Sequence, residues 1–186
     1  MNAYNGCDVK HTEKGYLLRA KPESDMVVDP MTGTVVSNAV YMADDVTGDF
    51  TFSACVSHDF ASTYDACCLI AYANDTLWSK ACFECTEKGE HAVVTVMTDG
   101  CSDDANSVRI EDKKVWLQMC RRGNVISVQY STDGENWIFV RILSILLPET
   151  VRLGILAQSP VGAGGEFLFE DIRLKNTAPD NMRFGR

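Results

Sequence analysis

The stretch VWLQMCRRGNVISVQYSTDGENWIFVRIL, residues 115–143, decides the fold. It contains three runs rich in β-branched, aromatic and other apolar residues, at 115–120, 125–131 and 136–143. Between the runs, Gly123 and the pair Asp133-Gly134 supply the positive backbone angles that tight hairpin turns need. The stretch therefore predicts three antiparallel strands joined by two hairpin turns.

Residues within these runs alternate between two faces. Val115, Leu117 and Met119 point one way, and the residues between them point the other. Similar runs recur at 50–56, 64–73, 77–85, 91–98, 151–158 and 166–174, and the apolar residues that share a face in 151–158 are Val151, Leu153, Ile155 and Ala157. No segment shows a long amphipathic helical period. The pattern predicts an all-β chain folded as an antiparallel β-sandwich or jelly roll.

The length of 186 residues fits one domain that buries a sizeable core. We expect a single β-sandwich domain over residues 1–176. Residues 177–186 are polar and are expected to form a C-terminal tail that could be disordered. The first forty or so residues have a weaker pattern, and Pro22 and Pro30 bound a stretch that we expect to be a loop.

Charge and hydropathy narrow the range of partners. Lys and Arg total 17 against 26 Asp and Glu, a formal charge of -9 that repels phosphate backbones and anionic lipid surfaces. The longest apolar stretches, such as ILSILL at 142–147, are far too short to span a bilayer. We therefore expect a soluble, cytoplasmic protein with neither nucleic acid nor membrane as a partner.

Eight cysteines raise the question of a disulfide or metal framework. Cys67 and Cys68 are adjacent inside an apolar run, which favours free thiols packed as small hydrophobic side chains. Cys82 and Cys85 have a C-x-x-C spacing, but on a strand they point to opposite faces and cannot share one metal ion. Histidine is scarce, with three residues in the chain. We predict no metal site and no cofactor.

The segment 77–85 also carries charged residues. The period of two places Trp78, Lys80, Cys82 and Glu84 on one face, and Ala81 and Phe83 on the other. Lys80 and Glu84 can pair across the intervening residue and leave polar atoms for a ligand. The alternative is a solvated strand face with an ordinary surface ion pair.

Four ordered blocks resemble the successive motifs of the family catalogued as domain of unknown function 1349. The blocks are YDACCLIAYANDTLWSKACFE (64–84), VVTVMTDGCSDD (93–104), VQYSTDGENWIFVRI (128–142) and VRLGILAQSPVGAGGEFLFEDIRL (151–174). The resemblance covers roughly residues 45–175. It implies a fold of the concanavalin A-like lectin and glucanase superfamily, whose best-known ligands are carbohydrates.

The resemblance also implies a set of ligand-binding residues. These are Asp65, Trp78, Lys80, Glu84, Ser102, Asp103, Arg141, Gln158 and Ser159. The chain departs from the family pattern at Cys68, where a glycine is usual, and at Asp104, where a tryptophan is usual. The second departure removes an aromatic platform on which a sugar could stack.

We hypothesise a non-catalytic binding domain with a polar cleft on the concave sheet, for a carbohydrate or a similar polyhydroxylated ligand. In this cleft Arg141 and Lys80 donate hydrogen bonds and Glu84 and Asp103 accept them. A serious rival is an internal ion-pair network that binds no ligand.

Two other functions stay open. One is a glycoside hydrolase of glucanase type, with Glu84 as one carboxylate and Asp103, or alternatively Asp65, as the second on another strand. Glucanases of the superfamily place their acids on one strand as Glu-x-Asp-x-Glu. At that spacing this chain has Lys80, Cys82 and Glu84, so the pair of acids on a single strand is absent. The other is a protein-binding module that regulates a metabolic enzyme.

Overall fold

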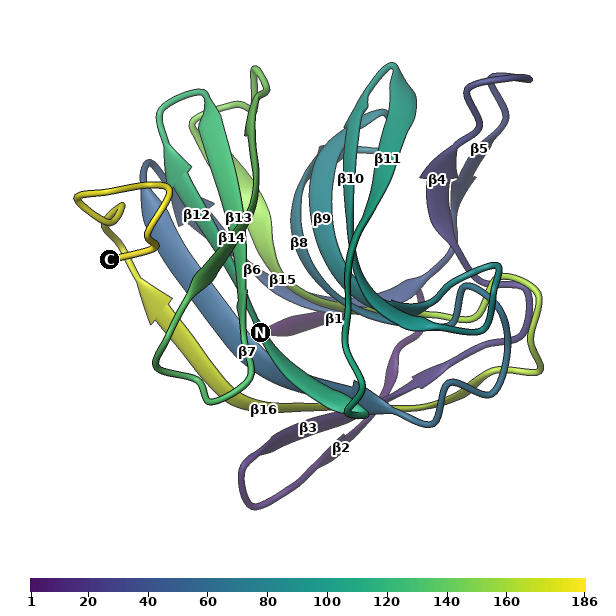
Figure 1. The fold of residues 1–186 in the computed structure, drawn as a ribbon. Coiled ribbons are helices and arrows are strands. Elements are labelled where there is room, and N and C mark those ends of the chain that lie inside the picture. Colours follow the sequence, from purple (N-terminus) through teal and green to yellow (C-terminus); the bar gives the residue numbers. More distant parts are fainter.

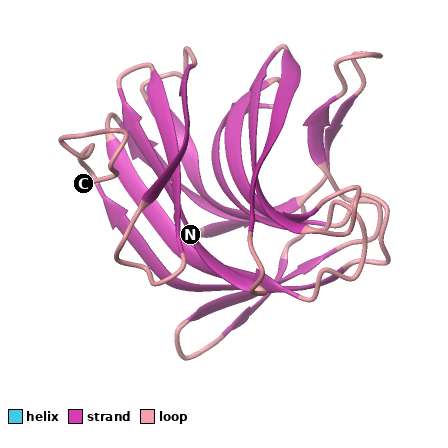
Figure 2. Cartoon of the chain, viewed as in Figure 1, coloured by secondary structure: helices cyan, strands magenta, loops and turns pink.

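The computed structural model describes residues 1–186, and its regular elements are all β-strands (Figure 2). The predicted all-β class is confirmed. Strands form at each of the runs that the sequence indicated, and β12 (Lys114–Arg122), β13 (Val125–Ser131) and β14 (Ile138–Ser144) are consecutive antiparallel neighbours. The decisive stretch therefore folds as its turns predict.

Two seven-stranded antiparallel sheets pack face to face (Figure 1). The first, which we call the cleft sheet, has the order β1 (Asn2–Tyr4), β6 (Val40–Thr47), β15 (Thr150–Gln158), β8 (Ala66–Asn74), β9 (Leu77–Cys85), β10 (His91–Asp99) and β11 (Cys101–Arg109). The second, the back sheet, has the order β14, β13, β12, β7 (Phe50–His58), β16 (Gly165–Lys175), β3 (Gly15–Ala20) and β2 (Asp8–His11). This arrangement is the predicted β-sandwich.

The turn between β13 and β14 shows why its sequence is required. Gly134 has a φ of +78°, a backbone conformation that side chains with a Cβ rarely adopt. A Cβ at this position would also approach Nε1 of Trp116 to 2.9 Å. Asp133 accepts hydrogen bonds from the backbone N–H groups of Glu135 and Asn136, which closes the turn.

The main apolar core lies between the two sheets, where the predicted alternation places it. Val115, Leu117 and Met119 of β12 face this core, and so do the four apolar residues predicted to share a face in β15. A second apolar cluster lies on the outer face of the cleft sheet and includes Met26 and Trp78. The cleft sheet is thus apolar on parts of both faces.

The second cluster exists because a short hairpin covers that outer face. β4 (Met26–Val28) pairs with β5 (Val35–Ser37), and the hairpin stands across from β10 and β11 (Figure 1). The expectation of a loop between Pro22 and Pro30 is therefore wrong for residues 26–28. The β4 strand is three residues long, too short for alternation to reveal it.

Residues 177–186 lie against the outer face of the back sheet and are held there. Gln118 donates from Nε2 to the carbonyl of Gly185 at 3.0 Å, and Gln129 donates to the carbonyl of Met182 at 2.6 Å. Arg122 also donates to the carbonyl of Pro179. These bonds give the tail a defined position, in contrast to the disorder that its composition allowed.

The chain has no helix that is long and apolar enough to cross a membrane.

Candidate ligand-binding cleft

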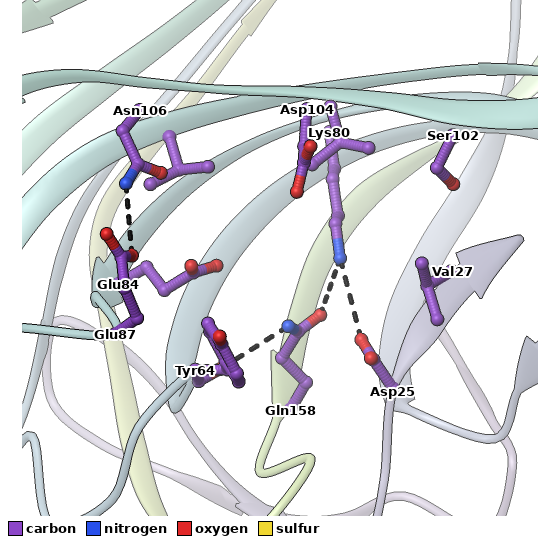
Figure 3. Close-up of a pocket in the computed structure, with 12 residues that line it drawn as sticks. Asp25, Val27, Tyr64, Lys80, Glu84, Glu87, Ser102, Asp104, Asn106 and Gln158 are labelled. Carbon is purple, nitrogen blue, oxygen red and sulfur yellow. Dashed lines mark hydrogen bonds and ion pairs between the residues drawn. The ribbon is translucent and has the colours of Figure 1, made fainter. Parts of the chain in front are cut away.

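A cleft of about 530 Å³ opens on the outer face of the cleft sheet. Its floor comes from β9, β10 and β11, and one wall comes from the segment at β4 (Figure 3). The lining residues are Asp25, Val27, Tyr64, Lys80, Glu84, Glu87, Val94, Val96, Ser102, Asp104, Asn106 and Gln158. Four predicted site residues are among them, namely Lys80, Glu84, Ser102 and Gln158.

Strand register explains why these side chains meet. Lys80 of β9 lies opposite Val96 of β10, which in turn lies opposite Asp104 of β11. Directly opposed residues of neighbouring strands point to the same face of a sheet. Lys80 and Asp104 are therefore on the cleft face together, one strand apart.

Lys80 is buried, with 3% of its surface exposed, and its ammonium group is fully engaged. Nζ donates to the carbonyl of Met26 at 2.8 Å. It also donates to Oε1 of Gln158 at 2.8 Å and lies 3.7 Å from Oδ1 of Asp25 (Figure 3). Burial alone lowers the pKa of Lys80, but the neighbouring acidic groups Cys82, Asp25, Cys68 and Glu84 outweigh it and raise the pKa above its ordinary value. Lys80 therefore stays protonated and ties β4 and β15 to β9.

Glu84 is the contrasting case, because its carboxyl group has no hydrogen-bond partner in the protein. Its surface is 8% exposed. Burial is the main cause that raises the pKa of Glu84 to about 7, and nearby negative charge adds to it. Lys80 acts in the opposite direction and lowers the pKa, and no hydrogen bond contributes. Every fully enclosed side-chain nitrogen or oxygen in the protein does have a partner. The Glu84 oxygens must therefore be reached from the cleft.

Three further carboxyl groups line the cleft. Asp25 lies before β4, Glu87 follows β9, and Asp104 is on β11. Asn106 donates from Nδ2 to Oε2 of Glu87 at 3.3 Å. Together with Glu84, these acids give the cleft four carboxyl groups against the single ammonium of Lys80.

Tyr64 supplies an exposed aromatic ring at the cleft, with 41% of its surface exposed. Its backbone is in the left-handed region, with φ of 66°, and its N–H donates to the carbonyl of Cys85 at 2.6 Å. Gln158 donates from Nε2 to the carbonyl of Tyr64 at 3.4 Å. A non-glycine residue in this conformation is strained and persists only when its surroundings fix it.

Asp65 and Ser159, both predicted site residues, provide that support and do not line the cleft. Oδ1 of Asp65 accepts a hydrogen bond from Oγ of Ser159 at 2.6 Å, and Oδ2 accepts one from the N–H of Ser62 at 3.0 Å. Ser159 also pairs with Ser24 through backbone hydrogen bonds in both directions. Asp65 follows Tyr64 in the sequence, and Ser159 follows Gln158. By holding these two positions, Asp65 and Ser159 fix the places of Tyr64 and Gln158 in the cleft.

Ser102 and Trp78 have structural roles on the cleft face. Oγ of Ser102 accepts a hydrogen bond from the N–H of Val28 at 2.9 Å, so it fastens β4 to β11. Trp78 is completely buried in the second apolar cluster. The tryptophan is therefore no stacking surface for a ligand.

Asp103 and Arg141 do not meet the other predicted residues. Arg141 of β14 donates to Oδ1 of Asp103 at 3.1 Å and to Oγ1 of Thr95 at 3.3 Å. Because β14 belongs to the back sheet, this pair links the two sheets on the side opposite to the cleft. Arg141 and Asp103 therefore lie outside the cleft that Lys80 and Glu84 line, and Glu84 and Asp103 do not form a pair of neighbouring carboxylates.

The cysteines are free thiols, and Cys82 lies on the outer face of β9 as predicted. Its Sγ is 3.1 Å from Sγ of Cys68 on β8. Burial raises the pKa of Cys82 well above its ordinary value, which keeps this thiol protonated. The chain contains no group of three or more His, Cys, Asp or Glu side chains arranged to hold a metal ion.

Sequence reasoning missed Asp104 and Asn106, although a signal for them was present. Asp99-Gly100 forms the turn between β10 and β11, with φ of +78° at Gly100, and it aligns Thr98 with Ser102. That register puts Asp104 and Asn106 on the face of Lys80. The contribution of Asp25 had no comparable signal, because it comes from a distant segment.

Comparison with known proteins identifies the family. The family model described as "Protein of unknown function (DUF1349)" matches residues 6–177, and the chain belongs to this family. The protein "Regulation of enolase protein 1" of Saccharomyces cerevisiae is 28% identical over 131 residues, which are 70% of this chain. The match covers 65% of that protein, so the chain spans less than two thirds of its relative's length.

Solved structures show the same fold. A functionally unknown protein from Saccharomyces cerevisiae superposes with a TM-score of 0.88 at 22% identity, over 97% of each chain. The carbohydrate binding module CBM66 from Bacillus subtilis gives a TM-score of 0.62 at 12% identity, over 92% of each chain. A GH43 protein from Bacillus licheniformis gives 0.70 at 15% identity, over 92% of this chain and 35% of that one. These likenesses confirm the antiparallel β-sandwich fold.

Proposed function

We propose that the protein is a non-catalytic binding domain that takes a saccharide, or a similar polyhydroxylated molecule, in the cleft between β9–β11 and β4. The observation that carries the proposal is the carboxyl group of Glu84. It is 8% exposed and has no partner within the protein. Its oxygens open to the cleft, so a ligand there can replace the water that otherwise reaches them, and in this largely buried setting its hydrogen bonds are strong.

The cleft matches the two kinds of surface that a sugar presents. Tyr64 offers an exposed aromatic face for the apolar side of a sugar ring. Glu84 and Asp104 offer acceptors for hydroxyl groups, and Val94 and Val96 form an apolar floor. The volume of about 530 Å³ lies within the range of about 300 to 1,000 Å³ that is usual for small-ligand sites.

The structural likenesses support this choice among binding functions. One of the similar structures is a carbohydrate binding module, and it is similar over nearly the whole length of both chains. The likeness to the GH43 protein covers about a third of that longer chain. At these identities the likeness extends to the fold alone, so the proposal rests on the cleft.

A glycan array followed by calorimetric titration of the strongest glycan tests the proposal. Glu84→Gln should weaken binding roughly ten- to a hundredfold, because hydrogen bonds to a charged group contribute about 1.5 to 3 kcal/mol. Asp103→Asn is the control, since Asp103 faces away from the cleft, and its affinity should equal that of the wild type. Equal affinity of Glu84→Gln and the wild type would refute a binding role for this carboxyl group.

A second candidate, glycoside hydrolysis, is favoured by one observation. Burial raises the pKa of Glu84 to about 7, which suits a general acid, and Asp104 lies in the same cleft. If Glu84→Gln retains glycan affinity and abolishes release of reducing sugar, hydrolysis replaces binding as the function. Regulation of a metabolic enzyme, the third candidate, rests on the name of the yeast relative, and a pull-down with purified enolase tests it.

A further inference from the structure

The charged groups of the cleft differ in whether the protein already provides their partners. An ammonium group has three donors, and Lys80 donates two hydrogen bonds, to Met26 and Gln158, while Asp25 forms an ion pair with it at 3.7 Å. Lys80 is the only lysine or arginine that lines the cleft. A ligand in the cleft therefore meets an ammonium group that is already occupied.

The carboxyl groups of the cleft, in contrast, receive few hydrogen bonds from the protein. Glu84 has no hydrogen bond from the protein. Asp104 accepts no hydrogen bond in the structure, and Glu87 accepts one long bond from Asn106, at 3.3 Å. Among the charged groups of this cleft, those that lack a partner are therefore carboxyl groups.

We propose that the ligand carries a protonated amine as well as hydroxyl groups, in the manner of an amino sugar, and that its ammonium is bound by Glu84 with Asp104 and Glu87 beside it. This inference rests on the proposed function and specifies its ligand class. It follows from the count of charges, because four carboxyl groups face one lysine whose charge is shared with Asp25. A cationic ligand offsets this excess, whereas a neutral sugar leaves it in place.

The raised pKa of Glu84 fits this ligand class. Burial and neighbouring negative charge disfavour ionisation of Glu84 in the free protein. A ligand ammonium against the carboxyl group reverses that effect and favours the ionised form. Charge-assisted hydrogen bonds of this kind are shorter and stronger than neutral ones.

Tyr64 is the reason to choose a saccharide over a lysine-rich peptide. Tyr64 is 41% exposed, and its backbone, just before β8, is in the left-handed region. A flat aromatic face at the edge of an acidic cleft suits a rigid ring that carries an amine and hydroxyl groups. A flexible peptide would lose more conformational freedom on binding.

Three tetrasaccharides with the same β-1,4-linked backbone isolate the amine. The first is built of glucosamine, the second of N-acetylglucosamine, and the third of glucose. Titration calorimetry at about pH 6 keeps most of the glucosamine amines protonated, because the oxygens on neighbouring carbons make these amines less basic than the α-amino group of a protein, whose pKa is about 7.7 to 8.0. We expect the glucosamine tetrasaccharide to bind at least tenfold more tightly than the other two.

Two adjacent acids give a matched pair of variants. Asp104→Asn and Asp103→Asn remove the same charge from consecutive residues on opposite faces of β11. Asp104→Asn should weaken binding of the glucosamine tetrasaccharide several-fold, and Glu84→Gln tenfold or more, whereas Asp103→Asn should leave it unchanged. Thermal melting of each variant checks that it is folded.

The outcomes separate this inference from the proposed function. Neutral tetrasaccharides that bind as tightly as the glucosamine one, with affinity still lowered by Glu84→Gln, would overturn the amine and leave the saccharide cleft standing. An array without any bound glycan, neutral or cationic, would overturn both. A polylysine peptide that displaces the glucosamine tetrasaccharide and binds more tightly would overturn the assignment of a saccharide.

Discussion

Asp103 and Asp104 are consecutive residues of β11 and serve opposite faces of the same sheet. Asp103 accepts a hydrogen bond from Arg141 of the back sheet at 3.1 Å. Asp104 lines the cleft, in register with Lys80 across Val96. One residue of the pair therefore joins the two sheets, and the other belongs to the ligand site.

Loss of the Asp103–Arg141 pair should have a small effect on stability. Arg141 is 22% exposed and Asp103 is 59% exposed, so solvent screens much of the attraction. We expect Asp103→Asn to lower the free energy of unfolding by less than about 1 kcal/mol. Urea denaturation measures this, and a loss of several kcal/mol would show that the pair is a major link between the sheets.

Loss of the Lys80 ammonium group should have a large effect on stability, because this group is buried and has three partners in the protein. Lys80→Met leaves the carbonyl of Met26 and Oε1 of Gln158 without their donor and Asp25 without its cation. We expect a loss on the order of 3 kcal/mol in the free energy of unfolding, from unsatisfied acceptors and an uncompensated charge. A variant as stable as the wild type would contradict the tie between β4, β9 and β15.

Glu84 should make the protein less stable as pH rises. Its ordinary pKa is 4.5 and its pKa in the folded protein is about 7, so between these values the folded state binds more protons than the unfolded state. Stability is highest below pH 4.5 as far as this group is concerned, and is lost as pH rises through 7. The shift corresponds to about 3 kcal/mol above pH 7.

The difference between the wild type and Glu84→Gln isolates this contribution, because other carboxyl groups change both proteins alike. Glu84→Gln should be the more stable protein at pH 8, and its advantage should shrink toward pH 5. Urea denaturation at the two pH values gives the comparison. A constant difference across this range would mean that Glu84 ionises in the folded protein as it does in water.

Tyr64 should contribute to affinity through its ring. Tyr64→Ala removes the exposed aromatic face, and we expect up to about a tenfold loss of glycan affinity, equivalent to roughly 1 kcal/mol of stacking. Tyr64→Phe keeps the ring and should bind nearly as well. Both variants keep a Cβ at φ of 66°, so they share the backbone strain of the wild type. Equal affinities of the alanine and phenylalanine variants would remove Tyr64 from the site.

The period of two in a strand carried much of the prediction. It placed Trp78, Lys80, Cys82 and Glu84 together on one face of β9, and the structure confirms this. Glycine-containing turns likewise indicated the hairpins that join β12, β13 and β14. These features are local, so a few neighbouring residues determine them.

Features that depend on distant segments were beyond the reach of that pattern. Asp25 meets Lys80 because β4 folds over the outer face of the cleft sheet. Met26, which contacts Lys80 there, is 54 residues away from it in the sequence. Asp103 was assigned to the cleft from its position in the family motif, which does not say which face of the sheet its side chain takes. The register of β11 against β10 decides that question in favour of Asp104.

Chemical-shift mapping by NMR tests the location of the ligand site most directly. The strongest glycan from the array is titrated into isotope-labelled protein, and perturbed backbone amides are assigned. We predict perturbations at residues 80–87 of β9 and its turn, 94–96 of β10, 102–106 of β11 and 25–27 beside β4. Perturbations confined to the outer face of the back sheet, around Gln118 and residues 177–186, would contradict a saccharide site in this cleft.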